Sequence, residues 1–237
     1  MATRYAVAEL ESVDSTQDEA RERFADSDPV LVIAGHQTAG RGRLGREWLE
    51  PDRAVFASLA FEPVWPIEAW SLIPLAAGLA ARSTIGAVAG VTVGLRWPND
   101  LVVDAGKIGG LLAESGDGIV IVGFGLNLLW EDPIQGGAAL CETVPAPRTE
   151  REIAERWADR LLASMALPSD DWGIDEYRAA CVTIGRSVSY ASGSGTAVAV
   201  SDKGSLMVET TGGIIAVHSG EVRLDGRTTL STDPRRN

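Results

Sequence analysis

The sequence predicts an α+β fold in which helices flank a mixed β-sheet and a small β-barrel follows. Short apolar, β-branched runs alternate with helical patterns until about residue 168. From about residue 184 the chain changes to short strands punctuated by glycine, as in small β-barrels. Its 237 residues, 45% of them hydrophobic, suffice for one medium domain and an appendage. We therefore predict a main domain over 1–183, a small β domain over 184–230 and a frayed tail over 231–237.

Three segments are predicted to be helices, each from a different feature of the sequence. Thr16 and Glu19 have capping-box spacing at the start of the first segment. The second is rich in alanine and leucine and is entered near Pro74, which a first helical turn tolerates. In the third, Ile153 and Trp157 belong to one apolar stripe, which makes the helix amphipathic. The predicted helices are 15–25, 72–87 and 149–167.

Several apolar runs predict strands. Residues 29–34 (PVLVIA) and 54–61 (AVFASLAF) are short and rich in strand-forming side chains. Further along the chain, three β-like runs are separated by short turns, which predicts an antiparallel meander. These runs are 95–103 (LRWPNDLVV), 107–115 (KIGGLLAES) and 119–129 (IVIVGFGLNLL).

A glycine-rich loop joins the predicted strands 29–34 and 54–61. Residues 40–45 match the G-x-G-x-x-G dinucleotide fingerprint in form, and a strand precedes them. The fingerprint also requires a helix directly after it, whereas here Trp48, Pro51 and a strand follow. The loop carries arginine at positions 41, 43 and 46. We therefore interpret it as a connection between two strands whose side chains bind anions.

The composition argues against several classes of protein. A net charge of −12 disfavours duplex nucleic acid as a partner, because no general basic face would meet the phosphates. Cys141 and Cys181 lack metal-ligand spacing and the chain has only two histidines, so no zinc site is expected. Two unpaired thiols fit a reducing cytoplasm. No signal peptide opens the chain, and no apolar stretch of membrane length is free of charge or glycine, so we expect a cytoplasmic protein without membrane contact.

Four short polar stretches are each open to two interpretations. Residues 14–17 (DSTQ) suit a helix cap and also a site for a polar ligand. Gln37 follows a strand, where ordinary loop residues and ligand contacts both occur. Residues 96–100 (RWPND) suit a turn as well as a binding segment. Lys107 is one of only two lysines among 21 basic residues, which indicates a need for a compact point charge, whereas the other, Lys203, suits a plain turn.

Taken in chain order, five segments form a pattern: 14–17 (DSTQ), 40–48 (GRGRLGREW), 96–100 (RWPND), 107–114 (KIGGLLAE) and 123–127 (GFGLN). In this pattern the chain resembles the biotin protein ligases over roughly residues 9–225. The resemblance implies a class II synthetase-like catalytic domain and a small C-terminal SH3-like barrel. Arg96 departs from the family, which usually has lysine there. The stretch before Ser15 is too short for the DNA-binding domain of the repressor-type ligases, so we expect a monofunctional enzyme.

The resemblance also implies a two-step reaction. ATP activates biotin to biotinyl-5'-AMP with release of pyrophosphate, and Mg²⁺ assists. The biotinyl group then passes to a lysine of a biotin carboxyl carrier domain of acetyl-CoA or acyl-CoA carboxylase. Neither nucleic acid nor a membrane is an expected partner, and a homodimer is left open. Two alternatives remain: a lipoate-protein ligase or octanoyl transferase of the same superfamily, and a non-catalytic biotin-binding regulator.

The residues that match the family's motifs are expected to form one site. Arg41, Arg43 and Lys107 are the predicted catalytic residues, since their charge would offset the negative charge that accumulates at the α-phosphate. The loop that holds the two arginines has three glycines in six residues and is expected to order on ligand binding as a lid. The predicted biotin- and ATP-binding residues are Ser15, Thr16, Gln17, Gln37, Gly40, Arg41, Gly42, Arg43, Arg46, Trp48, Asn99, Asp100, Lys107, Gly109, Gly110 and Asn127.

Individual roles follow from the chemistry of biotin, which has a polar ureido ring and an apolar tail. Ser15, Thr16 and Gln37 are expected at the ureido ring, and Gly109 and Gly110 beside the tail. Three further residues are assigned around the adenylate. They are Trp48, which would close over it, Asn127, which would meet the adenine or ribose, and Asp100, which would orient the site or pair with a cation.

Overall fold

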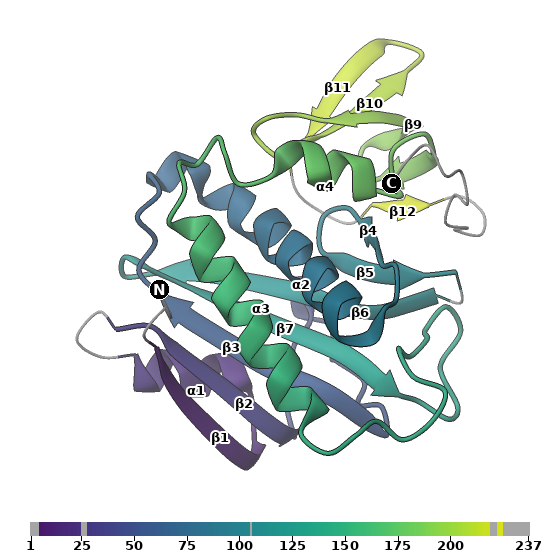
Figure 1. Ribbon diagram of the computed structural model, residues 1–237. Helices are drawn as coiled ribbons and strands as arrows, with labels where there is room; N and C mark the ends of the chain where they lie inside the picture. Colours follow the sequence, from purple (N-terminus) through teal and green to yellow (C-terminus); the bar gives the residue numbers. More distant parts are fainter. Residues whose placement is uncertain (1–4, 25–27, 105, 219–221, 225–237) are drawn as a thin grey trace.

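The structure, a computed structural model, describes residues 5–24, 28–104, 106–218 and 222–224 (Figure 1). Its helices are α1 (Thr16–Arg23), α2 (Ile73–Ala89), α3 (Thr149–Met165) and α4 (Ile174–Ala180), with 3-10 turns η1 (Arg43–Gly45) and η2 (Ile67–Leu72). The larger sheet contains β1 (Ala6–Val13), β2 (Val30–Gln37), β3 (Arg53–Phe61), β4 (Gly94–Arg96), β5 (Asp100–Val103), β6 (Gly106–Gly116) and β7 (Ile119–Leu129). The smaller sheet contains β8 (Ser187–Tyr190), β9 (Gly193–Val200), β10 (Leu206–Thr210), β11 (Gly213–Val217) and β12 (Arg223–Leu224).

The larger sheet is a seven-stranded mixed sheet in the order β1-β2-β3-β7-β6-β5-β4. Strand β1 runs parallel to β2, and every other neighbouring pair is antiparallel. The mixed sheet and the meander of β5, β6 and β7 are therefore confirmed. The segment 95–103 is not one strand, however, because it folds into the β4–β5 hairpin with Trp97, Pro98 and Asn99 at the turn. Strand β1 was not expected, since most of its side chains are exposed and it has no continuous apolar run.

Both faces of this sheet are covered, which requires apolar side chains at successive positions of its central strands. Figure 1 shows α2 and α3 lying together across one face and α1 on the other. In β2, Leu31 and Ile33 belong to the core beneath α2 and α3, while Val30 and Val32 belong to the core beneath α1. Trp157 of α3 is fully buried in the larger core, as the apolar stripe of that helix predicts.

The predicted helices are confirmed, with one correction. Helices α2 and α3 begin and end within two residues of the predicted bounds. The capping box predicted for the first helix is wrong, because α1 begins at Thr16 with Ser15 as its N-cap. The Ser15 hydroxyl accepts a hydrogen bond from the Gln17 backbone N–H at 3.3 Å. Residue 25, the predicted end of this helix, lies outside the described residues.

One stretch of the described chain, residues 67–89, is long and apolar enough to cross a membrane by length and composition. It comprises η2 and α2, and Arg82 interrupts it. A core helix passes the same test, and 56% of the most apolar window is buried inside the fold. Helix α2 packs against α3, β4, β5 and β6, which accounts for its apolar composition.

The C-terminal segment forms a second, antiparallel sheet in the order β11-β10-β9-β8-β12. A small β domain after the larger one is therefore confirmed. Val188 and Leu206 of this sheet belong to the same buried core as α2. The Trp97 indole N–H donates to the Gly204 carbonyl at 2.9 Å, so the small sheet also supports the β4–β5 turn. The domain boundary stays a prediction, and residues 225–237, including the predicted tail, lie outside the described chain.

Candidate functional site

A pocket of about 400 Å³ lies where the loop between β2 and β3, the β4–β5 turn and strands β6 and β7 meet. The small sheet contributes Arg223 and Leu224 of β12 to its wall. Most of the residues predicted from the sequence line this pocket, although they come from widely separated segments. Those that line it are Ser15, Thr16, Gln17, Gln37, Arg41, Gly42, Arg43, Arg46, Trp48, Asn99, Asp100, Lys107 and Gly110.

Gly40, Gly109 and Asn127 do not line the pocket, although they were expected to meet ligand. The Gly40 carbonyl accepts from the Trp48 backbone N–H at 2.9 Å and so helps to close the loop. A Cβ at position 109 would lie 2.5 Å from a carbonyl oxygen of β7, so this glycine permits the close approach of β6 and β7. Asn127 is buried and donates to the Ala138 carbonyl at 2.9 Å. The structure gives Gly40 a role in closing the loop and Gly109 a role in sheet packing, and contact of all three residues with ligand stays a prediction.

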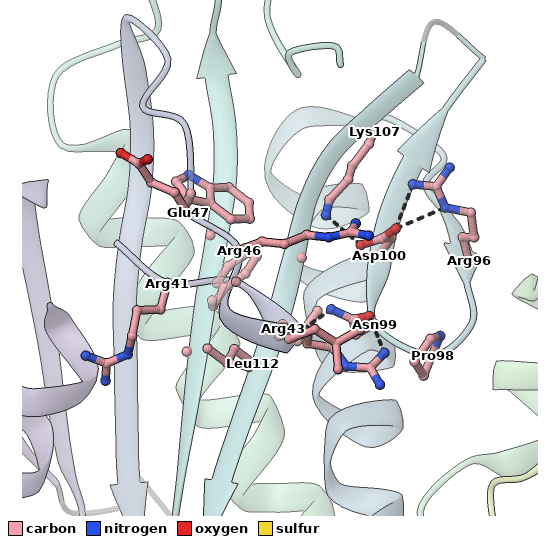
Figure 2. A pocket seen from close by; sticks show the side chains of 18 of the residues that line it. Arg41, Arg43, Arg46, Glu47, Arg96, Pro98, Asn99, Asp100, Lys107 and Leu112 are labelled. Atoms are coloured by element: carbon pink, nitrogen blue, oxygen red, sulfur yellow. Dashed lines mark hydrogen bonds and ion pairs between the residues drawn. The ribbon is translucent and has the colours of Figure 1, made fainter. Parts of the chain in front are cut away.

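Asp100, the first residue of β5, lies between two cations (Figure 2). Its Oδ1 lies 2.6 Å from Lys107 Nζ, and its Oδ2 lies 2.6 Å from Arg96 Nη2 and 3.0 Å from Arg96 Nε. Burial by itself would raise the pKa of this carboxyl group, but Lys107 and Arg96 together hold the pKa below its ordinary value. Asp100 is therefore ionised at neutral pH and orients the Lys107 ammonium in the pocket.

A register shift in the β5–β6 ladder determines where Lys107 points. Asp100 lies opposite Gly110, but between Leu101 and Val102 the register shifts, so that Lys107 lies opposite Val102. Side chains alternate between the two faces of a sheet, and a shift of one residue reverses the face. Without the shift, Lys107 would point to the face opposite Asp100. The irregularity therefore brings the ammonium and the carboxylate together.

The turn between β4 and β5 supplies Asn99, which is fixed by β6 and contacts the loop. Its backbone carbonyl accepts from the Leu111 N–H at 2.9 Å, and its side-chain amide donates to the Leu111 carbonyl at 2.8 Å. Its side-chain oxygen accepts from Arg43 Nη1 at 3.1 Å. The segment RWPND is therefore both a turn, with a cis Trp97–Pro98 peptide bond, and part of the pocket wall.

The connection between β2 and β3, residues 38–52, is named the arginine loop. Its position between two strands confirms that the glycine pattern marks a strand-to-strand connection, whereas binding of anions by its side chains stays a prediction. The loop folds back on itself, since the Gly42 N–H donates to the Arg46 carbonyl at 2.7 Å. Gly45 has a φ of 72°, a left-handed conformation that favours glycine. The backbone conformation of the loop therefore accounts for glycine at position 45, and no dinucleotide-binding turn is needed to explain it.

The arginines of this loop diverge. Figure 2 shows Arg43 and Arg46 extending toward the Asp100 side of the pocket and Arg41 pointing the other way. Burial lowers the pKa of Arg43, and the charge of Asp100 acts against that effect. Arg41 instead donates two hydrogen bonds to the Asp18 carboxylate of α1, at 2.6 and 2.7 Å. The structure does not bring the Arg41 guanidinium to the cluster around Asp100, and its catalytic role stays a prediction.

Trp48, near the end of the arginine loop, covers part of β7. A Cβ at Gly125 would lie 2.8 Å from two carbons of the indole, so glycine is required there. Lys107 Nζ lies 5.6 Å from the centroid of the same ring, within the range of a cation–π contact. The Trp48 indole nitrogen and Gln17 Oε1 are buried and have no hydrogen-bond partner among the described residues. Buried polar atoms ordinarily have partners, so these two atoms are candidates for contact with a ligand.

A polar part of the pocket is built by Thr16 and Gln37, with Ser58 behind them. The Thr16 N–H and hydroxyl both donate to Gln37 Oε1, at 2.9 and 3.0 Å. Thr16 Oγ1 also lies 2.8 Å from Ser58 Oγ, which is fully buried in β3. These bonds fix the orientation of the Gln37 amide. Ser58 was not expected, although it is the one polar residue in the apolar run 54–61.

The comparisons with known proteins agree with one another. The model of the biotin/lipoate A/B protein ligase family matches residues 9–127. The biotin acetyl-CoA-carboxylase ligase of Mycobacterium tuberculosis is 36% identical over 84% of this chain and 80% of that protein. The bifunctional ligase/repressor BirA of Bacillus spizizenii is 27% identical over 90% of this chain and 72% of that protein. The biotin protein ligase of Aquifex aeolicus in complex with biotin and ATP superposes with a TM-score of 0.77, at 25% identity over 93% of this chain and 98% of that chain.

The ion pairs of Asp100 lead to a prediction about stability and pH. Asp100→Asn leaves Lys107 and Arg96 without their shared counter-charge, and we expect the free energy of unfolding at neutral pH to fall by about 2 kcal/mol. This is less than for a fully buried pair, because 20% of the Asp100 side chain is exposed. Since the folded-state pKa is lowered, the stabilisation is complete above the unfolded carboxyl pKa of about 4 and is lost as pH falls through the lower, folded-state value.

Urea denaturation of the parent and Asp100→Asn at a series of pH values measures this difference. It should be constant near neutral pH and shrink below about pH 4. Asp117→Asn, an exposed turn position with a φ of 53°, is the control and should match the parent. A stability difference that is absent at neutral pH, or that persists undiminished in acid, would contradict the assignment.

Proposed function

Because the chain belongs to the biotin/lipoate A/B protein ligase family, we propose that it is an ATP-dependent biotin protein ligase. The chain is a ligase, and its named relatives include biotin acetyl-CoA-carboxylase ligases of two bacteria. In the proposed reaction, biotin and ATP give biotinyl-5'-AMP and pyrophosphate, and the biotinyl group then passes to a lysine of a carrier domain. The observation that carries the proposal is the cluster of Lys107, Arg96 and Arg43 in one pocket of a chain with a net charge of −12.

The first step needs positive charge beside two anions. A biotin carboxylate oxygen attacks the α-phosphorus of ATP, and the bond from that phosphorus to the pyrophosphate oxygen breaks. Lys107 has three N–H donors, of which the Asp100 carboxylate, at 2.6 Å, accepts one. The other two donors can bridge the biotin carboxylate and the α-phosphate oxygens. Arg43, oriented by Asn99 at 3.1 Å, adds a second cation where negative charge accumulates.

The second step uses the same cations. The neutral amine of the carrier lysine attacks the carbonyl carbon of the mixed anhydride, the carbon–oxygen bond to AMP breaks, and the amine proton passes to solvent. Lys107 and Arg43 then stabilise the phosphate of the leaving AMP. The arginine loop, as a lid, would keep water from the anhydride before the carrier lysine arrives.

The remaining parts of the pocket suit the body of biotin and the nucleotide. Ser15, Thr16 and Gln37 provide hydrogen-bonding groups for the ureido ring, and Gly110 lines the wall where the tail would lie. The buried Trp48 indole N–H has no partner in the described chain, which supports a contact between this side chain and the adenylate.

The proposed Mg²⁺ ion would arrive with ATP. The described residues include no group of three or more histidine, cysteine, aspartate or glutamate side chains that could hold a metal ion. Asp100 already contacts two cations. Mg²⁺ commonly binds through substrate phosphates and few protein carboxylates, and there it neutralises phosphate charge. This fits a site whose own contribution is arginine and lysine.

We further propose that the acceptor is a biotin carboxyl carrier domain of acetyl-CoA or acyl-CoA carboxylase, and that the enzyme acts in the cytoplasm. Cys141 and Cys181 are free thiols, as a reducing compartment maintains them. Two other functions use the same fold. A lipoate-protein ligase or octanoyl transferase would transfer a different acyl group, and a biotin-binding regulator would transfer none.

One experiment distinguishes these functions. The protein is incubated with ATP, a biotin carboxyl carrier domain and either radiolabelled biotin or radiolabelled lipoate, and label on the carrier is measured. We expect ATP-dependent transfer of biotin and little transfer of lipoate. Transfer of lipoate alone would indicate a lipoate-protein ligase, and binding of biotin without transfer would indicate a biotin-binding regulator.

Lys107→Ala should be the most damaging single substitution in the chain. It removes a charge-assisted contact to both reacting anions, which we expect to cost about 3 kcal/mol in the transition state, or about a hundredfold in rate. Lys107→Arg should also fail, because a planar guanidinium cannot present the same point charge. Pyrophosphate release with biotin and ATP, at matched thermal stability, is the measurement.

Lys203→Ala is the control for this substitution. Lys203 is exposed between β9 and β10, so its removal should leave the rate unchanged. A Lys107→Ala enzyme that turns over within a few-fold of the parent would refute the catalytic role of Lys107 while leaving the family assignment intact.

Arg43→Gly should separate formation of the intermediate from its retention. Lys107 still supplies charge for the first step, but the adenylate phosphate loses a partner beneath the arginine loop. We expect adenylate formation to continue in part and free biotinyl-AMP to appear in the medium, where chromatography detects it. Arg148→Gly, at an exposed arginine outside the pocket, is the control. Retention of the adenylate equal to that of the parent would rule out this role.

A further inference from the structure

Arg41 makes a contact that the proposed reaction does not use. Its two terminal nitrogens donate to the two oxygens of the Asp18 carboxylate, at 2.6 and 2.7 Å, in the two-pronged geometry that arginine and carboxylate groups favour. A second carboxylate, that of Glu114 in β6, lies 3.9 Å from the same guanidinium. The hydrogen bonds between Arg41 and Asp18 raise the pKa of Arg41 and lower the pKa of Asp18, so both groups are charged at neutral pH.

Asp18 sits on a rigid support. It is the third residue of α1, whose Ala20 is fully buried, and α1 packs against β2, β3 and β7. Glu114 belongs to the central meander of the sheet. Arg41 therefore connects the arginine loop to elements that the core holds in place.

The loop is attached on the opposite side of the pocket as well. There Arg43 donates to Asn99 at 3.1 Å, and the Trp48 indole packs against Gly125 of β7. Arg41, Arg43 and Trp48 all line the pocket, and Figure 2 shows the Arg41 side chain directed away from the other two arginines. The loop thus spans the pocket between two anchors, of which the contact with Asp18 is one.

The strength of this anchor suits a contact that opens and closes. The side chains of Arg41 and Asp18 are 39% and 53% exposed. Ion pairs this exposed are weak and are screened by salt, so such a pair changes an equilibrium by no more than about fivefold. That is too little to support the fold, but it is enough to change how often a loop leaves the pocket.

We propose that Asp18 is a positioning residue that acts through Arg41 to hold the arginine loop across the pocket. Loss of this contact increases the time the loop spends open and lets the activated intermediate escape. The second consequence rests on the proposed function, whereas the first concerns the protein alone.

Limited proteolysis without biotin or ATP tests the first consequence. Trypsin cleaves after arginine, so cleavage after Arg43 and Arg46 reports opening of the loop and is followed by mass spectrometry. Asp18→Asn should increase the rate of this cleavage about fivefold. Glu22→Gln removes one negative charge from an exposed position of the same helix and should leave the rate unchanged. Raising the salt concentration should bring the parent toward the Asp18→Asn rate.

The same measurement in an Arg41→Gln background shows whether Asp18 acts through Arg41. If it does, Asp18→Asn has no further effect once Arg41 is replaced. An equal increase in both backgrounds would mean that Asp18 acts only by stabilising α1, and no increase in the parent would mean that it does not hold the loop. Either result overturns the proposal.

The second consequence is tested with biotin, ATP and a limiting amount of carrier domain. Asp18→Asn should raise the ratio of free adenylate to biotinylated carrier about fivefold, with adenylate formation nearly unchanged. A ratio equal to that of the parent overturns the role in retention. If the parent forms no adenylate at all, the proposed function fails, and the proteolysis result still decides the role of Asp18 in holding the loop.

Discussion

The ion pairs of Asp100 with Lys107 and Arg96, each 2.6 Å at the closest atoms, are the interaction on which the pocket depends. They hold two cations close together, where without the carboxylate the cations would repel each other. In a chain with a net charge of −12, positive charge at one place has to be built from such local contacts. Lys107 is consequently held in position before substrate binds, and charge that is organised in advance is what stabilises a developing anion.

The fold supports this carboxylate from several directions. The register shift in the β5–β6 ladder turns Lys107 to the face of Asp100. The turn just before Asp100 is held by Trp97, whose indole N–H donates at 2.9 Å to the carbonyl of Gly204, in the turn between β9 and β10 of the small sheet. The small sheet therefore also supports the larger sheet, since the bond from Trp97 to Gly204 holds the segment that carries Asp100. On the other side of the pocket, α1 provides the polar residues and the anchor for the arginine loop.

The sequence predicted the parts of this structure that depend on periodicity and on short motifs. Helices α2 and α3 and the mixed sheet were expected, and most of the predicted site residues lie in the pocket, because apolar spacing and closely spaced polar motifs are visible in the chain. Strand β1 was missed, because an exposed edge strand lacks an apolar run. The β4–β5 hairpin and the direction of Lys107 depend on strand register, which the sequence does not show. The partner of Arg41 is Asp18, 23 residues away, a contact that only the tertiary structure reveals.

In the proposed reaction, Lys107, oriented by Asp100, and Arg43 form the site for the α-phosphate. A crystal structure with a sulfamoyl analogue of biotinyl-AMP, which cannot react, tests it most directly. We expect the sulfamoyl group to lie about 3 Å from both Lys107 Nζ and the Arg43 guanidinium, with Asp100 still paired to Lys107. A sulfamoyl group bound away from Lys107, or held by Arg41 after it has left Asp18, would show that Lys107 and Arg43 do not form this site.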